Sequence, residues 1–157
     1  MPEEIGIRAF PERWVLCAAA ATTADDLGDT LADLFPKLLD HANEAGAKVC
    51  GVPMTRYGAS QADGSMEIEA CLPVESACAV GEGFACVELP ACRAAATMHH
   101  GPYENLGDAH FALGEYVRVN RLETAGECWE EYVNDPGAAP DPSKWMTLVC
   151  WPVKPAE

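Results

Sequence analysis

At 157 residues the chain is long enough for one domain with its own hydrophobic core. Apolar residues make up 49% of the sequence and charged residues 22%, which is typical of a globular protein and excludes a disordered chain. The formal net charge is −15, from 25 acidic and 10 basic residues. Such a charge repels phosphate backbones and anionic lipids, so we expect no direct nucleic-acid binding and no membrane binding. It either attracts cationic ligands or only keeps the chain soluble.

The apolar and cysteine patterns indicate a cytoplasmic protein. The longest apolar run, residues 14–21, is much shorter than the roughly 20 residues that span a bilayer, and acidic residues precede it, unlike in a secretory signal. The 8 cysteines include no Cys-x-x-Cys pair and no zinc-ligand spacing. We therefore predict reduced thiols, no metal and no other cofactor.

The first half of the chain reads as a strand, a helix and two strands. Residues 13–22 have strand composition, and Thr23 begins a helix whose leucines and alanines recur at helical spacing until Gly46. Pro36 lies inside this helix and predicts a kink or a break. Two further strands are expected at 49–57 and 66–74, joined by a loop that contains Gly and Asp.

The second half repeats the order. Strand-like composition returns at 84–87 and 91–98, and a Gly-Pro-Tyr turn begins a second helix that ends near Asn120. The last two strands are expected at 127–133 and 145–153. The same four elements therefore occur twice, in the same order.

Residue matches between the halves predict an internal duplication. A shift of 75 residues places Tyr57 on Tyr132, and a shift of 79 places Cys71 on Cys150. The pseudo-repeats span about 10–75 and 84–154 of a single domain, 1–157. We predict an α+β fold of duplicated β-α-β-β units, with two helices on one face of a mainly antiparallel sheet and a ligand groove between the halves.

The segment Trp129-Glu130-Glu131-Tyr132 is the candidate centre of that groove. In a strand, successive side chains alternate between faces, so Glu130 shares a face with Tyr132 while Trp129 and Glu131 face the other way. A carboxylate beside aromatic rings suits an organic cation, and an enclosed carboxyl can also act as a general acid or base. A solvent-facing glutamate on an ordinary strand is the alternative.

The repeat extends this site to the first half. Thr55 and Tyr57 are the counterparts of Glu130 and Tyr132, and Glu69 is the counterpart of Leu148. Tyr57 could instead be a cross-strand packing residue, and Trp151 could be a core residue. The predicted ligand-binding residues are Glu130, Tyr132, Tyr57, Thr55, Glu69, Leu148 and Trp151.

Other constellations carry little chemistry. His99 and His100 are neighbours in a strand and point to opposite faces, so they cannot chelate a metal together. His110 fits a helix face as a polar surface residue or a satisfied interior one. The sequence has no nucleophile elbow, no phosphate-binding glycine loop and no dinucleotide fingerprint, so nucleophilic catalysis has no visible support.

Three segments together resemble the GyrI-like small-molecule-binding family, the effector-binding domain of bacterial multidrug-responsive transcription activators. They are AAATMHHGPYENL at 94–106, WEEYVNDP at 129–136 and TLVCWPV at 147–153. The resemblance implies a duplicated fold with a central groove, and an acid on the penultimate strand that contacts apolar, often cationic ligands. Glu130 stands where that acid is expected, and Leu148 stands where some members carry a glutamate.

Three functions follow as hypotheses. The first is binding of hydrophobic, cationic or aromatic small molecules, with Glu130 as the acidic contact. The second is hydrolysis of strained alkylating molecules, with Glu130 directing water. The third and weakest is inhibition of DNA gyrase. Because only about a dozen residues precede the first predicted strand, we expect a stand-alone member without a DNA-binding segment.

Overall fold

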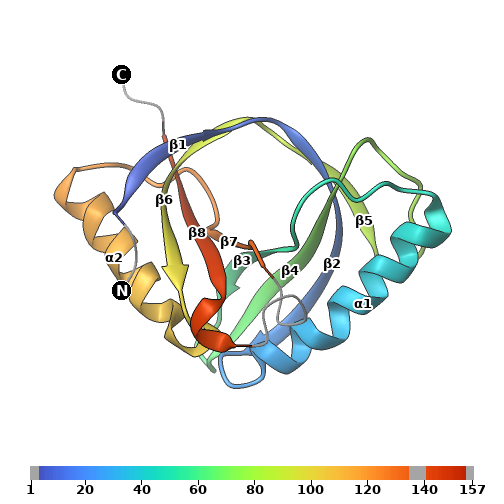
Figure 1. Ribbon diagram of the computed structural model, residues 1–157, viewed down its shortest axis with the longest axis horizontal. Helices are drawn as coiled ribbons and strands as arrows, with labels where there is room; N and C mark the ends of the chain where they lie inside the picture. The colour runs from blue at the N-terminus through green and yellow to red at the C-terminus, as the bar shows by residue number, and fades with distance from the viewer. Residues whose placement is uncertain (1–3, 135–140, 155–157) are drawn as a thin grey trace. The chain divides into compact units, whose positions relative to one another are not determined.

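The computed structural model describes residues 4–134 and 141–154, which form two compact units (Figure 1). The central unit comprises residues 12–90, and the terminal unit comprises residues 1–11 and 91–157. Asp135 and Pro136, which belong to the second family-like segment, lie outside the described residues.

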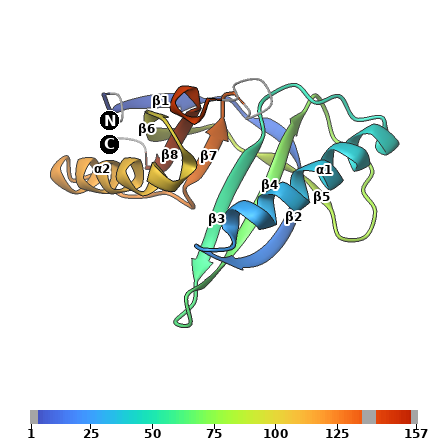
Figure 2. The ribbon, with the colours of Figure 1, turned by 60° about the horizontal axis from the view of Figure 1, so that its bottom comes forward.

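The central unit is a four-stranded antiparallel sheet with one helix packed on it. The sheet order is β3-β4-β2-β5, and α1 contributes the buried Leu38 and Ala42 to a core with Leu16 and Leu72 (Figure 2). Its elements are β2 (Arg13–Thr23), α1 (Leu27–Ala45), β3 (Met54–Ser60), β4 (Ser65–Val74) and β5 (Ala85–Leu89).

The terminal unit has the same layers. Its sheet order is β1-β6-β8-β7, all antiparallel, and α2 buries Leu106, Ala109, Leu113 and Val117 against Val149. Its elements are β1 (Gly6–Phe10), β6 (Cys92–His100), the 3-10 turn η1 (Tyr103–Asn105), α2 (Leu106–Val119), β7 (Trp129–Tyr132), the 3-10 turn η2 (Pro142–Lys144) and β8 (Met146–Val153). The predicted α+β class with antiparallel strands is confirmed.

The first helix is not broken at its proline. The sequence predicted a kink or a break at Pro36, and no break occurs, because α1 runs through Pro36 to Ala45 and is capped by Gly46, whose φ is 71°. Burial of Leu38 and Ala42 on the sheet offsets the hydrogen bond that proline cannot donate. Packing therefore holds this helix together where local propensity would interrupt it.

The two units repeat the same strand pairing at the shifts read from the sequence. Met54 is paired with Cys71 as Trp129 is with Cys150, which corresponds to shifts of 75 and 79 residues. The isolated bridge Val49–Val74 of the central unit corresponds to Thr124–Val153 of the terminal unit. Two backbone hydrogen bonds correspond in the same way: Cys50 N to Pro73 O matches Ala125 N to Pro152 O, and Glu75 N to Lys48 O matches Lys154 N to Glu123 O. This agreement supports the predicted duplication.

One strand was missed in the sequence. β1 pairs with β6, Gly6 opposite Ala96, in the same register in which β5 pairs with β2, Ala85 opposite Cys17. The five residues of β1 are too few to show a clear alternation, and Pro11 follows directly. β1 is thus the counterpart of β5 at the shift of 79 residues. Neither α1 nor α2 is long and apolar enough to cross a membrane, and no other helix in the described ranges is.

Two glycines of α1 should respond in opposite directions to substitution by alanine. Gly46→Ala places a Cβ at positive φ and should lower the free energy of unfolding by about 1 kcal/mol. Gly28→Ala, inside the helix with no atom within 4 Å of the new Cβ, should raise it by about 0.5 to 1 kcal/mol. Urea denaturation checks both, and equal effects would contradict the assigned helix end.

Candidate functional site

Glu130 is a buried carboxylate in β7, with only 2% of its surface exposed. Its Oε2 lies 2.7 Å from Nε2 of His110, and its Oε1 accepts a hydrogen bond of 3.0 Å from the hydroxyl of Tyr132. Glu130 is paired with Val149, a core residue against which α2 packs, so its side chain is on the α2 side of the sheet. Strand alternation alone could not decide between this side and the other.

The neighbouring acid serves the opposite face. Glu131 is paired with Leu148, and its Oε2 accepts a hydrogen bond of 2.8 Å from the indole nitrogen of Trp129. The ring of Trp129 packs edge-on against Phe10 of β1 at 5.1 Å between centroids. The two adjacent glutamates therefore have separate partners, and only Glu130 meets α2.

His110 of α2 connects Glu130 to β8. Its Nδ1 accepts a hydrogen bond of 3.0 Å from the indole N–H of Trp151, so Nε2 carries the proton that is donated to Glu130. Burial lowers the pKa of His110, but hydrogen bonds with Cys128 and Glu130 outweigh burial and raise this pKa to about 9. The indole N–H opposes the rise because it requires a lone pair on Nδ1. Nε2 holds a proton in either charge state.

Aromatic rings complete the cluster. The ring of Tyr103 lies 5.4 Å from that of Tyr132 and 4.7 Å from that of Trp145, between centroids. Tyr103, Trp145 and Trp151 are half-buried, whereas Tyr132 is buried. We call the following residues of the terminal unit the carboxylate cluster: Tyr103, His110, Glu130, Tyr132, Trp145 and Trp151. Of these, Glu130, Tyr132 and Trp151 were predicted from the sequence as ligand contacts.

The remaining predicted residues lie on β3, β4 and β8. Thr55 and Tyr57 lie in the central unit, opposite Ala70 and Ile68, on the α1 side of that sheet. Leu148 lies in β8 on the face away from α2, opposite Glu131. The predicted set is thus divided between two units and two faces.

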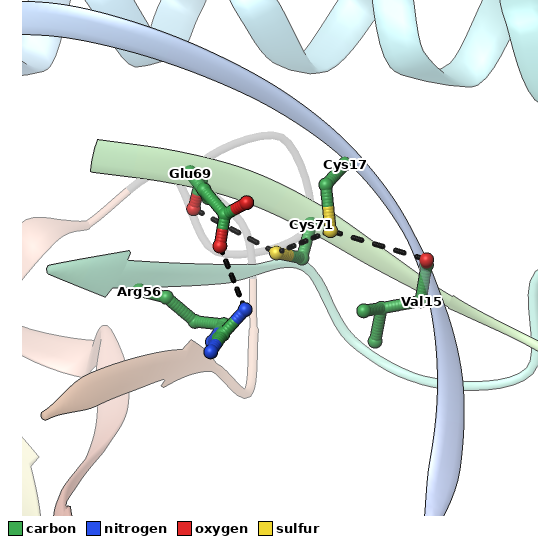
Figure 3. Close-up of polar contacts among 5 residues, drawn as sticks. All are labelled: Val15, Cys17, Arg56, Glu69 and Cys71. Carbon is green, nitrogen blue, oxygen red and sulfur yellow. Dashed lines mark hydrogen bonds and ion pairs between the residues drawn. The ribbon is translucent and has the colours of Figure 1, made fainter. Parts of the chain in front are cut away.

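Glu69 has a cationic partner of its own. Arg56 Nη1 lies 2.7 Å from Glu69 Oε1, and both side chains are about one-third exposed or less, at 27% and 35% (Figure 3). Beside this pair, the thiols of Cys17 and Cys71 face each other across β2 and β4 at 3.1 Å. The hydrogen bond to Cys17 and burial raise the pKa of Cys71 well above its usual value, so this thiol stays protonated. The negative charge of Glu69 is therefore already balanced by Arg56 within the central unit.

His110 and Cys128 were not selected from the sequence. The sequence held only a weak signal for them. Either Ala109 or His110 fits the helical position that faces the sheet, and Cys128, two residues before Glu130, lies on the same strand face. Within 4–134 and 141–154, no three His, Cys, Asp or Glu side chains converge as a metal site would require.

The family model of the GyrI-like small molecule binding domain matches residues 3–154. The chain belongs to this family. The resemblance carried by the three sequence segments is thereby confirmed. No curated protein sequence matches the chain.

Solved structures share the fold of this GyrI-like domain. The C-terminal domain of EcmrR has a TM-score of 0.88 and 21% identity, covering 98% of both chains. In a complex of EcmrR with DNA, the TM-score is 0.87 at 21% identity, covering 98% of this chain and 58% of that one. The chain thus spans 58% of the EcmrR chain in that complex.

Two more distant structures carry chemical descriptions. SAV2435 bound to tetraphenylphosphonium has a TM-score of 0.65 and 12% identity, covering 97% of this chain and 94% of that chain. A hydrolase from Listeria innocua has a TM-score of 0.61 and 13% identity, covering 96% and 92%. At such identities the likeness concerns the fold alone.

The pKa of His110 should depend on Glu130. In Glu130→Gln the negative partner is lost while burial remains, so the pKa of His110 should fall below its wild-type value of about 9. Because the folded-state pKa is raised, the pair stabilises the fold fully below the unfolded value of about 6.5 and loses this effect as pH rises towards 9. NMR titration of the histidine ring protons measures the shift. The ring of His41, in the central unit, is the internal reference, and an unchanged His110 titration would contradict the assignment.

Proposed function

We propose that this GyrI-like domain binds hydrophobic organic cations or aromatic molecules, with Glu130 as the acidic contact. The observation that carries the proposal is a carboxylate with 2% of its surface exposed inside a cluster of tyrosine and tryptophan rings. Removing a charge from water costs several kcal/mol unless it is paired and hydrogen-bonded. The cluster meets this cost with His110 and Tyr132.

A ligand cation can take over the role of His110. With a pKa raised to about 9, His110 supplies the positive charge opposite Glu130. A bound cation at the same carboxylate would repel the imidazolium and favour its deprotonation, which leaves on Nδ1 the lone pair that accepts the Trp151 N–H. Binding and proton release would therefore be coupled.

The aromatic rings supply the remaining affinity and allow ligands of different shapes to bind. Ring faces attract a nearby cation by roughly 0.5 to 2 kcal/mol each, depending on desolvation, and they also bury apolar surface. The net charge of −15 raises the local concentration of cations at the surface. A structural neighbour, SAV2435, has been solved with tetraphenylphosphonium, a cation of this class.

Glutamine substitution at the two adjacent glutamates tests the proposal. Glu130→Gln keeps the shape of the side chain but removes its charge, and should weaken binding of tetraphenylphosphonium or a lipophilic rhodamine by roughly 10- to 100-fold. Glu131→Gln removes the same charge from the opposite face and is the matched control, with a change of about twofold or less. Isothermal titration calorimetry or dye fluorescence gives both constants, and thermal melting verifies folding.

Equal effects of the two substitutions would show that only net charge matters. An unchanged affinity in Glu130→Gln would remove Glu130 from the site.

Hydrolysis of strained alkylating molecules is the second candidate, favoured by the Glu130–His110 contact of 2.7 Å. In this mechanism a water adds its hydroxyl to the electrophilic carbon of a strained ring. Glu130 accepts the proton that the water loses and passes it to the ring carbon whose bond breaks, so the net change is the addition of one water. The enclosure of Glu130 would exclude bulk water from competing reactions. The structure adds no observation in favour of gyrase inhibition.

Turnover separates hydrolysis from binding. Incubation with a cyclopropane-bearing alkylating compound should yield, by mass spectrometry, many equivalents of a product heavier by one water if the domain is a hydrolase. Glu130→Ala should abolish this product and Glu131→Gln should retain it. Binding of one equivalent without product would leave the domain a binder.

A further inference from the structure

Two buried polar atoms beside the carboxylate cluster have no hydrogen-bond partner in the described residues: Nδ1 of His99 and Oγ1 of Thr147. His99 is 3% exposed and Thr147 is 0% exposed. The other ring nitrogen of His99, Nε2, lies 3.1 Å from the carbonyl oxygen of Pro102. Because a carbonyl only accepts, Nε2 carries the proton and Nδ1 presents a lone pair. The Nδ1 acceptor of His99 and the hydroxyl of Thr147 are thus both left without a hydrogen bond within the described ranges.

Strand pairing places both atoms next to the cluster. Thr147 of β8 is paired with His99 of β6 on one side and with Tyr132 of β7 on the other, so the three side chains form one row on the same face. Glu130 stands two residues before Tyr132 on that face and is hydrogen-bonded to its hydroxyl. The row therefore borders the carboxylate directly.

The fold does not require polar residues in this row. At the same shifts, the central unit has the row Ala20, Ile68 and Tyr57, paired in the same register. An alanine and an isoleucine thus fill the places of His99 and Thr147 where a helix packs on an equivalent sheet. An unsatisfied buried polar group lowers the free energy of unfolding by about 1 to 3 kcal/mol. Apolar residues at these two positions would avoid that loss, so packing alone does not explain His99 and Thr147.

We propose that His99 Nδ1 and Thr147 Oγ1 receive a hydroxyl group of the ligand that binds at Glu130. This rests on the proposed function and narrows its ligand class to cations that also carry a neutral hydrogen-bonding group. The ligand group donates to His99 Nδ1 and accepts from the Thr147 hydroxyl. The ring of Tyr103, which is half-buried, packs on Tyr132 at one end of this row.

A matched series of phosphonium cations tests this pair of groups, His99 Nδ1 and Thr147 Oγ1, which we call the seat. The probes are triphenylphosphonium ions whose fourth ring carries either a hydroxymethyl or an ethyl group at the ortho, meta or para position. Each pair has the same permanent charge and nearly the same size, and differs in one hydroxyl. Calorimetry on the wild type, Thr147→Val and Thr147→Ser measures the affinity ratio of each pair.

In the wild type, at least one hydroxymethyl isomer should bind roughly 3- to 10-fold more tightly than its ethyl partner. This ratio should fall to about one in Thr147→Val, which removes the hydroxyl with little change of shape, and should persist in Thr147→Ser, which keeps it. A ratio near one for all three isomers in the wild type, as expected if a water fills the seat, would overturn the inference. So would a preference that survives in Thr147→Val.

These failures are distinct from failure of the proposed function. If the ethyl probes bind and lose affinity in Glu130→Gln while no pair shows a preference, cation binding stands and the seat is rejected. If no probe binds, both are rejected. Thr147→Val has a second readout, because removing an unpartnered buried hydroxyl should leave the melting temperature unchanged or higher. Thr22→Val, which breaks a 2.8 Å bond to Thr30, should lower it.

Discussion

A carboxylate buried against a helix is the constraint on which the terminal unit depends. Glu130 cannot be left without donors, because an unpaired buried charge would cost several kcal/mol. Its two donors are His110 from α2 and Tyr132 from the same strand, and His110 in turn takes the indole N–H of Trp151 in β8. Through these contacts Glu130 joins α2 to β7 and β8 and orients the indole ring of Trp151. Removing any one of these contacts would leave another polar group unsatisfied.

The two units show what this chemistry adds to a common fold. They share strand order, pairing registers and a helix on one sheet face, yet where the terminal unit has Glu130 and Trp151 the central unit has Thr55 and Leu72. The central unit keeps its own charges, Arg56 and Glu69, on the face away from α1, where they pair with each other. Both units thus have an apolar core beneath their helix, and the terminal unit adds a polar network to it. The fold therefore forms without this network, and the ligand role proposed for the network would account for its presence in one unit only.

Period-two alternation and the repeat were readable in the sequence because both depend on neighbours along the chain or on matching segments. They placed Glu130 with Tyr132 and predicted the shifts that the strand pairing repeats. Which face of the sheet meets a helix depends on packing between distant elements, so the roles of His110 and Trp151 in holding Glu130 were not visible. The predicted common set also included Glu69 and Leu148, which lie on the faces away from the helices. β1 was missed because its five residues are too few to show an alternation, and only its pairing with the distant β6 defines it as a strand.

A site built in this way can be broad and still discriminate. Ring faces impose little direction on a ligand, so the aromatic residues accept many shapes, and the carboxylate selects only for positive charge. His110 holds the place of that charge when its ring is protonated, and a ligand must therefore compensate for displacing an internal partner. This requirement excludes neutral molecules of the same shape more strongly than it limits cations. Direction can come only from groups with fixed hydrogen-bond geometry, and on this face the unsatisfied ones are His99 and Thr147 among the described residues. In the proposed site, charge would set the class of ligand, the rings would set the range of shapes accepted, and His99 and Thr147 would set the orientation in which a ligand is held.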